Sequence, residues 1–284
     1  MTAQQKGFIY TALSAVCFAT GGLLIKLNTW SSMSINGMRS FFAFFIFLLY
    51  MKLTKHQFKF NWKVLLGVVA NSMMGITFIM ANKMTTAANA IVLQFTLPIY
   101  IMLLAWIFQK KKPDKVSVIS GMISLVGIMF FFFESLSLGG MTGNVLALVS
   151  GFFYAIVFLI KQIPDSDFES SAIISFVLNF VIGIPFILQE NDWGIMNMST
   201  GVLQGVVQIG LAYIFLNMAL DKVPPVGASL ISMIEPILNP VLVAIFYGEK
   251  IGKISFVGAI IVLASALFYN LRGTGVEENN ESAK

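Results

Sequence analysis

The sequence predicts an all-α polytopic membrane protein whose ten transmembrane helices form two inverted five-helix repeats. Of its 284 residues, 57% are hydrophobic and 11% are charged, and the mean hydropathy is +0.85. A soluble domain carries about 25% charged residues, so this chain has too little charge to cover a water-exposed surface. Ten apolar runs and an internal repeat complete the prediction.

The chain offers little chemistry for metals or nucleic acids. One cysteine and one histidine exclude a disulfide framework and a metal site built from several Cys and His ligands. We therefore expect no metal and no cofactor. The net charge of +5 does not indicate nucleic-acid binding, because the lysines lie in short loops between apolar runs.

Five apolar runs in the first half of the chain are each close to the 20 or so residues that cross a bilayer core. The first run follows Lys6 and resembles a signal peptide, but it is longer than the usual apolar region of one, and cleavage would leave nine spans. We therefore expect it to remain as a helix. The next four runs are separated by short loops near Trp62 and Trp106, which suit the membrane interface. These spans are residues 7–26, 34–53, 64–82, 87–108 and 115–133.

Five more runs follow in the second half, again with short connections. Lys161 closes the first of them, and Trp193 lies in the loop before the third, as expected near an interface. The chain ends in a polar segment, residues 272–284, whose composition predicts a disordered tail. The five spans are residues 142–162, 169–188, 199–220, 225–247 and 252–271.

The distribution of basic residues predicts the orientation. With the N-terminus inside, 13 of the 18 Lys and Arg residues lie on the inner side, mostly in the loops after the second and fourth spans. We therefore expect a multi-pass protein of the cell (cytoplasmic or inner) membrane with both termini in the cytoplasm.

The second half of the sequence echoes the first at a nearly constant shift. Pro98 matches Pro236 at 138 residues, Ser14 matches Ser150 at 136, and Gly121 matches Gly258 at 137. Since each half holds an odd number of spans, the second half enters the membrane inverted, as in alternating-access carriers. The expected units are residues 1–134, residues 142–271 and the tail 272–284.

The residues of the second half also carry a family resemblance. The chain resembles the EamA-type transporters of the drug/metabolite transporter superfamily, with a looser fit in the first half. The resemblance implies a ten-helix carrier whose cavity is lined by helices one, three, four, six, eight and nine, with helices five and ten peripheral. Phe18 replaces the usual Trp of helix one. The matching residues are Leu211, Ala212, Tyr213, Asn217, Ala219, Leu220, Ala228, Ile234, Glu235, Pro236, Gly248, Glu249 and Gly258, and in the first half Phe18, Lys26, Arg39, Ala81, Lys83 and Pro98.

Glu235 is the only acidic residue well inside a predicted span. An ionisable group at this depth is costly and marks a functional site by default. Glu235 can exchange a proton as the cavity changes sides, or face a cationic substrate. The alternative is a structural role, in which its carboxyl group binds backbone donors near the adjacent proline.

Three prolines interrupt the spans that contain them. Pro98, Pro236 and Pro240 lack an N–H, so they free the carbonyls of Gln94, Ser232 and Pro236. Paired broken helices in corresponding positions indicate the binding site of a transporter. The alternative is a kink that serves packing alone.

The remaining candidates are polar or aromatic residues at helical spacing inside the spans. Such residues also join helices to one another. Tyr213 and Asn217 rank highest, because they share a helix face and match the family pattern. Together with Glu235, the candidate substrate-binding residues are Tyr213, Asn217, Tyr154, Phe18, Ser14, Gln94, Phe78, Ser232 and Asn239.

Two basic side chains near the span ends have competing interpretations. Arg39 is expected to extend toward the lipid headgroups, with capture of a substrate carboxylate as the alternative. His56 lies in a Lys-rich loop, where solvent or lipid contact is expected.

These features predict a secondary active transporter of small organic metabolites, amino acids or related compounds, working by alternating access and in the efflux direction. The alternative is a proton-coupled or exchange carrier for an organic cation such as a quaternary amine. An intramembrane enzyme is disfavoured, because the deep acid is unpaired and the histidine lies in a loop. A lipid flippase stays open. The expected partners are a small-molecule substrate, the lipid bilayer and a coupling proton or counter-substrate, in a monomer or homodimer.

Overall fold

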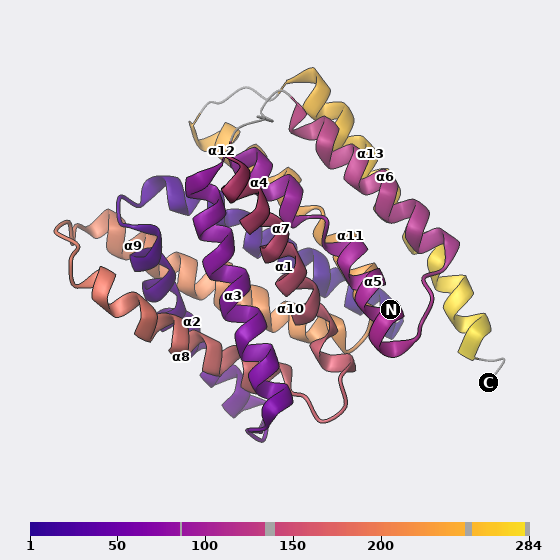
Figure 1. Ribbon diagram of the computed structural model, residues 1–284, viewed down its shortest axis with the longest axis horizontal. Coiled ribbons are helices and arrows are strands. Elements are labelled where there is room, and N and C mark those ends of the chain that lie inside the picture. The colour runs from indigo at the N-terminus through magenta and orange to yellow at the C-terminus, as the bar shows by residue number, and fades with distance from the viewer. Residues whose placement is uncertain (86, 134–139, 248–251, 282–284) are drawn as a thin grey trace.

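The computed structural model describes residues 1–85, 87–133, 140–247 and 252–281, and all regular structure in these ranges is helical (Figure 1). Within the helices, the side chains of Lys26, Lys83 and Pro240 lie outside the described part, as do the motif residues Gly248 and Glu249 altogether. The all-α class predicted from composition is confirmed.

The helices of the first half begin at short polar residues. The Thr2 side chain accepts from Gln5 N at 3.2 Å, and Ser31, Asn61 and Asp114 accept in the same way at the helices that follow them. Such caps satisfy amide groups that have no partner inside a helix. The helices are α1 (Ala3–Leu27), α2 (Ser32–Leu53), α3 (Trp62–Met84), α4 (Ala87–Gln94), α5 (Leu97–Gln109) and α6 (Lys115–Phe131).

The second half repeats this order. Asp167 caps α8, and a π-helical segment joins two α-helices within the eighth span. The elements are α7 (Met141–Leu159), η2 (Ile160–Gln162), α8 (Phe168–Ile187), α9 (Ile195–Leu203), η3 (Gln204–Leu211), α10 (Ala212–Leu220), α11 (Pro225–Ser232), α12 (Glu235–Tyr247) and α13 (Lys253–Glu281).

Among the described residues, seven helical segments are long and apolar enough to cross a membrane. The fifth and tenth predicted spans appear as the shorter apolar helices Lys115–Phe131 and Lys253–Tyr269. The ninth is divided between α11 and α12. The ten predicted runs therefore all correspond to single helices or to consecutive helical segments.

The fourth and ninth spans are interrupted at equivalent places. Phe95–Thr96 separates α4 from α5, and Met233–Ile234 separates α11 from α12, which is the same position after a shift of 138 residues. The tightened turns also match, since Thr96 N donates to Leu93 O at 3.3 Å as Ile234 N does to its own i−3 carbonyl at 3.0 Å. The predicted pair of broken helices is present.

The prolines lie just after these breaks rather than within a kinked helix. Pro98 and Pro236 are each the second residue of the following helix, where the missing N–H costs nothing because it has no helical partner. Pro240 does not break the chain, because α12 continues to Tyr247.

The packing has the pseudo-symmetry of two inverted halves. α2 packs along its repeat mate α8, and α6 along its mate α13. α1 packs along α10, and the mates of these two helices, α7 and α3, also pack together. Figure 1 shows α6 and α13 side by side at one edge, which agrees with their expected peripheral position.

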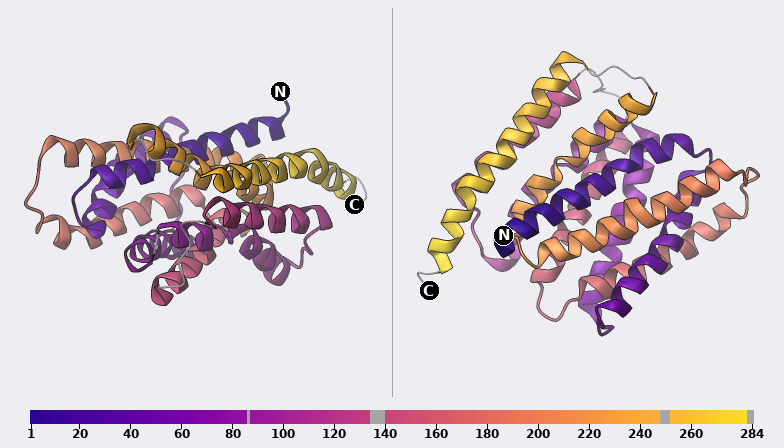
Figure 2. Two further views of the ribbon diagram at one scale, coloured as in Figure 1. Left: turned by 90° about the horizontal axis from the view of Figure 1, so that it is seen from above. Right: turned by 180° about the vertical axis from the view of Figure 1, so that it is seen from behind.

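α1 begins and α13 ends at the same end of the bundle (Figures 1 and 2), as ten crossings require. α13 differs from the prediction in one respect, because it continues to Glu281 through part of the tail for which composition predicts disorder. Extending a helix costs less free energy than starting one, so the helix formed by the apolar span continues into the polar residues that follow it.

Polar loop contacts join the halves at the end away from the chain termini. Trp30 Nε1 donates to Asp192 O at 2.6 Å, and Asn28 Nδ2 donates to Asn197 O at 3.1 Å. Ser31 N donates to Glu190 Oε1 at 2.8 Å. These contacts tie the α1–α2 loop to the α8–α9 loop and to the first turn of α9.

The opposite end, which carries Lys52, Lys55, Lys59 and Lys63 and is called the Lys-rich end below, has an equivalent set of contacts. Lys59 N donates to Ser170 Oγ at 2.9 Å, and Lys63 Nζ lies 2.8 Å from Asp165 Oδ2. The hydrogen bond and the charge of Lys63 lower the pKa of the Asp165 carboxyl group. The repeat relates the contacts at the two ends. It matches the α1–α2 loop with the α7–α8 loop, and the α8–α9 loop with the α2–α3 loop.

α2 and α8 touch through glycines, which gives a test of their packing. A Cβ on Gly183 would lie 2.5 Å from Gly37 Cα, whereas a Cβ on Gly75 would meet nothing closer than 3.7 Å. We expect Gly183→Ala to destabilise the protein by about 1–3 kcal/mol, as overpacking does, and to lower its melting temperature in detergent. The matched variant Gly75→Ala is expected to be neutral or stabilising. Equal melting temperatures for the two variants would contradict this packing.

Candidate functional site

A central cavity of about 220 Å³ lies among both halves of the protein. Residues of six predicted spans line it, from α1, α2, α3, α4, η3 and α12. The volume is below the roughly 300–1,000 Å³ typical of sites for drug-sized ligands. The lining residues are Phe18, Gly21, Gly22, Ile25, Ser32, Ile35, Arg39, Phe78, Ile79, Ile91, Gln94, Phe95, Gln208, Glu235, Pro236 and Asn239.

Half of the substrate-binding residues expected from the sequence lie in this lining. They come from four different spans and include the acid, two amides and two aromatic rings. These residues are Phe18, Phe78, Gln94, Glu235 and Asn239.

The other expected residues lie in the packed structure around the cavity. Ser14 Oγ donates to Ala212 O at 2.8 Å, and Ser232 is buried at the end of α11. Asn217 lies at the Lys-rich end, where its Nδ2 donates to Glu169 Oε1 at 2.7 Å. Ser14 and Asn217 therefore join helices in this structure, the role that small polar residues often have in membranes.

Tyr154 and Tyr213 form a buried aromatic layer behind Phe18. The Phe18 ring lies 5.7 Å from that of Tyr213 and 6.5 Å from that of Tyr154, edge to face in both cases. The Tyr213 hydroxyl donates to Asn71 Oδ1. This layer closes the cavity on its Phe18 side, and Phe18 alone of the three residues reaches the cavity.

Glu235 is the first residue of α12 and follows the break in the ninth span directly. Its Oε2 atom is buried and has no hydrogen-bond partner among the described residues. The interpretation of Glu235 as a structural cap for nearby backbone donors finds no such contact at this oxygen. An unpartnered buried acceptor is costly, and a bound ligand is a natural source of the missing donor.

Arg39 also faces the cavity, which corrects the expectation that it extends toward the headgroups. Only 8% of the residue is exposed, and its Nε and Nη2 atoms donate to Asn36 Oδ1 at 3.2 and 2.9 Å. The guanidinium group lies beside Gly75 of α3, where a Cβ would be 3.8 Å from Nη2, an ordinary contact distance. No carboxylate of the described residues forms an ion pair with Arg39.

Three amides complete the polar part of the lining. Gln94 Nε2 donates to Ser150 Oγ at 2.8 Å, and Gln208 Oε1 is buried without a partner among the described residues. Two adjacent glycines of α1 make space for the other tips. A Cβ on Gly21 would overlap Gln208 Nε2, and one on Gly22 would overlap Asn239 Oδ1, at 2.1 and 1.9 Å.

Sequence reasoning missed part of this lining. The second span contributes to the lining through Arg39. The sixth span, which the family resemblance places in the lining, contributes no lining residue, because its Tyr154 lies behind Phe18. The signal for Gln208 was a polar residue inside an apolar run. The signal for the positions of the Gln208 and Asn239 amides was the Gly21–Gly22 pair. The space that these glycines leave becomes visible only when α1 is packed against η3 and α12.

The fold is that of a helical membrane protein built from two inverted repeats, with a cavity lined by residues of both halves. The chain belongs to the EamA-like transporter family, whose model matches residues 5–133 and again residues 141–271. Family membership and the names of the relatives indicate a membrane transporter of the drug/metabolite type rather than an enzyme.

Two curated relatives are similar over most of the chain. An uncharacterized transporter of Archaeoglobus fulgidus is 22% identical over 258 residues, covering 90% of this chain and 93% of the relative. The uncharacterized transporter YwfM of Bacillus subtilis is 24% identical over 217 residues, 73% of each chain. A solved crystal structure matches with a TM-score of 0.83 at 12% identity, over 96% of this chain and 99% of its own, which concerns the fold alone.

The position of the cavity can be tested by cysteine labelling. In a Cys17→Ser background, we expect Asn239→Cys and Gln208→Cys to react with a hydrophilic thiol reagent on the order of tenfold faster than Ser14→Cys, because thiolate formation needs water. Ser14 is the matched control, since it is a polar residue of a span that packs against backbone. Equal labelling of the three positions would mean that the cavity is not hydrated.

Proposed function

We propose that this protein is a secondary active transporter of small zwitterionic organic metabolites, amino acids or related compounds, and that it exports them across the cell membrane by alternating access. The observation that carries the proposal is the pair of opposite charges in the cavity. Arg39 and Glu235 line the same space, yet they form no ion pair with each other. A substrate with one anionic and one cationic group would supply both missing counter-charges.

The chemistry of the two groups supports this assignment. A guanidinium group binds carboxylates with paired, directional hydrogen bonds, and a carboxylate accepts hydrogen bonds from an ammonium group. The amides of Gln208 and Asn239 add neutral polar contacts. Phe78, Phe95 and Ile91 supply apolar wall for the rest of the substrate.

Alternating access is supported by the packing of the cavity. The aromatic layer of Phe18, Tyr154 and Tyr213 closes it on one side, while the lining residues of α1, α2 and α3 lie toward the end that carries the α1–α2 loop. In a carrier of inverted repeats, the mirrored arrangement of the two halves opens the site to the other side. We place the Lys-rich end and both termini in the cytoplasm, following the distribution of basic residues.

The energy source in this proposal is a proton or a counter-substrate. Glu235 is the group in the cavity that can take up a proton when no cationic substrate neutralises it. Protonation then allows the empty carrier to reorient without a bare buried charge, which is expensive in the membrane.

An organic cation is the second candidate substrate. The observation that favours it is the combination of Glu235 with the rings of Phe18, Phe78 and Phe95 around one cavity, because aromatic faces attract cations. In this alternative Arg39 has no role in binding, which separates the two candidates.

Flux measurements in proteoliposomes test both candidates. We expect uptake of labelled amino acids by the wild type, and a fall of roughly 30-fold or more for Arg39→Gln and for Glu235→Gln, because each change leaves one substrate charge buried and unpaired. Arg39→Lys keeps the charge and is expected to retain part of the flux. Arg272→Gln, which changes the other arginine at the end of the tenth span, is the control.

The outcomes divide the candidates cleanly. Flux of a quaternary amine that survives Arg39→Gln but not Glu235→Gln would favour the organic cation. Amino-acid flux that is unchanged in both cavity variants would contradict the proposed site.

A further inference from the structure

A second space, separate from the central cavity, lies between α2 and α8 at the Lys-rich end. It has a volume of about 550 Å³ and shares no lining residue with the cavity. Its walls are apolar, formed by Phe44 and Leu48 of α2 with Ile174 and Val177 of α8, and its mouth carries Lys52 and Lys55. We call this space the α2–α8 groove.

The groove lies on the part of the surface that faces lipid. Both helices are membrane-span candidates, and apolar side chains beside the groove are exposed, with Leu49 at 54%, Val177 at 44% and Val181 at 54%. Because Phe44, Leu48 and Lys52 follow one another at intervals of four, they form one stripe of α2. The stripe is about 12 Å long, so the groove runs along the membrane normal rather than across it.

The mouth of the groove carries uncompensated positive charge. Lys52 and Lys55 are exposed, and neither forms an ion pair with a described carboxylate. The two acids at the start of α8, Asp167 and Glu169, accept hydrogen bonds from other groups. Asp167 accepts from Ser170 N at 2.7 Å, and Glu169 accepts from the Asn217 amide.

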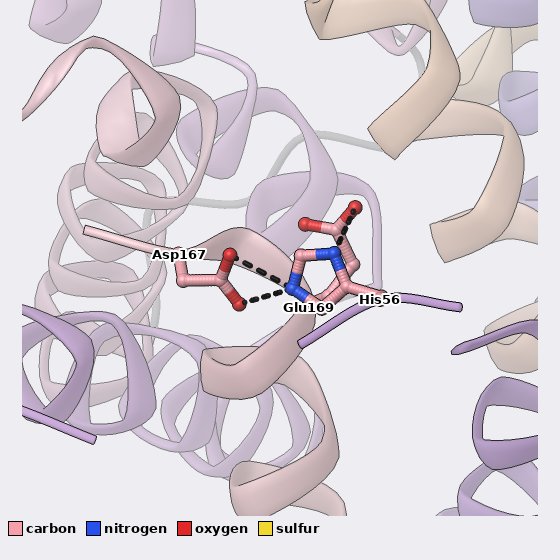
Figure 3. Close-up of side chains that lie close together, drawn as sticks. All are labelled: His56, Asp167 and Glu169. Carbon is pink, nitrogen blue, oxygen red and sulfur yellow. Dashed lines mark hydrogen bonds and ion pairs between the residues drawn. The ribbon is translucent and has the colours of Figure 1, made fainter. Parts of the chain in front are cut away.

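The loop that forms the mouth is fixed against α8 by His56. Lys55 has a positive φ of 54°, and this left-handed turn allows His56 N to donate to Met51 O at 2.9 Å. The imidazole then lies between two carboxylates, with Nε2 3.0 Å from Asp167 and Nδ1 3.8 Å from Glu169 (Figure 3). The two acids meet different ring nitrogens, and together they hold the ring in place.

We propose that the α2–α8 groove binds one anionic phospholipid, with its phosphate between Lys52 and Lys55 and an acyl chain along Phe44, Leu48, Ile174 and Val177. Basic sites between membrane helices bind acidic headgroups in this way. The long apolar wall distinguishes a lipid from free phosphate, which would use the mouth alone. The inference does not depend on the substrate of the central cavity.

Native mass spectrometry of the delipidated protein tests the headgroup contact. We expect one phosphatidylglycerol to bind, and Lys52→Gln/Lys55→Gln to weaken its binding about 25-fold. The matched control is Lys110→Gln/Lys111→Gln, which removes two lysines from the loop after α5 and is expected to bind as the wild type does. Equal binding of phosphatidylcholine, equal binding by the two double variants, or displacement by glycerol phosphate at the same concentration would overturn the proposal.

A second pair of variants tests the apolar wall. Val177→Trp fills the groove, whereas Val181→Trp places the same ring one turn along α8, beyond the groove lining. We expect the first variant to lose phosphatidylglycerol and the second to keep it, with both proteins eluting as folded material. Loss of a dimer in Val177→Trp, with lipid binding unchanged, would assign the groove to a second copy of the chain and contradict the proposal.

Discussion

Hydrocarbon offers no hydrogen bonds to a peptide group, and this constraint decides where the chain can leave helical geometry within the membrane. The two interruptions, Phe95–Thr96 and Met233–Ile234, fall where residues of the same segments line the central cavity rather than lipid. Gln94 ends the helix before one interruption, and Glu235 begins the helix after the other. The breaks therefore bring an amide and a carboxyl group into one cavity.

Gene duplication explains the frame of the site but not its chemistry. The repeat gives equivalent breaks, equivalent loop–loop contacts at the two ends and mated helix pairs. The polar groups are unequal, since Leu97 stands where the second half has Glu235. In the mechanism that we propose, this symmetric frame changes sides while its asymmetric lining holds a substrate with two different ends. The α2–α8 pair, joined at both ends by loops, provides the outer wall on which we place a lipid.

Much of the fold could be predicted from the sequence, because membrane spans depend on run length and the repeat on spacing. The site was harder. Glu235 stood out, since an acid in an apolar run needs no structure to be noticed. Tyr213 and Asn217 lie outside the cavity lining, because helical spacing predicts a shared face but not the neighbour that this face meets. Arg39 looked interfacial by its distance from the span end, and only its burial in the cavity lining shows that it turns inward.

The central claim is that Arg39 and Glu235 each take one charge of the same bound molecule. An experimental structure with a transported amino acid bound, in a lipid nanodisc, measures this directly. The account predicts the ligand carboxylate within hydrogen-bond distance of the Arg39 guanidinium and its ammonium group against the Glu235 carboxylate. A ligand bound elsewhere, or a direct ion pair between the two side chains beside it, would contradict the account.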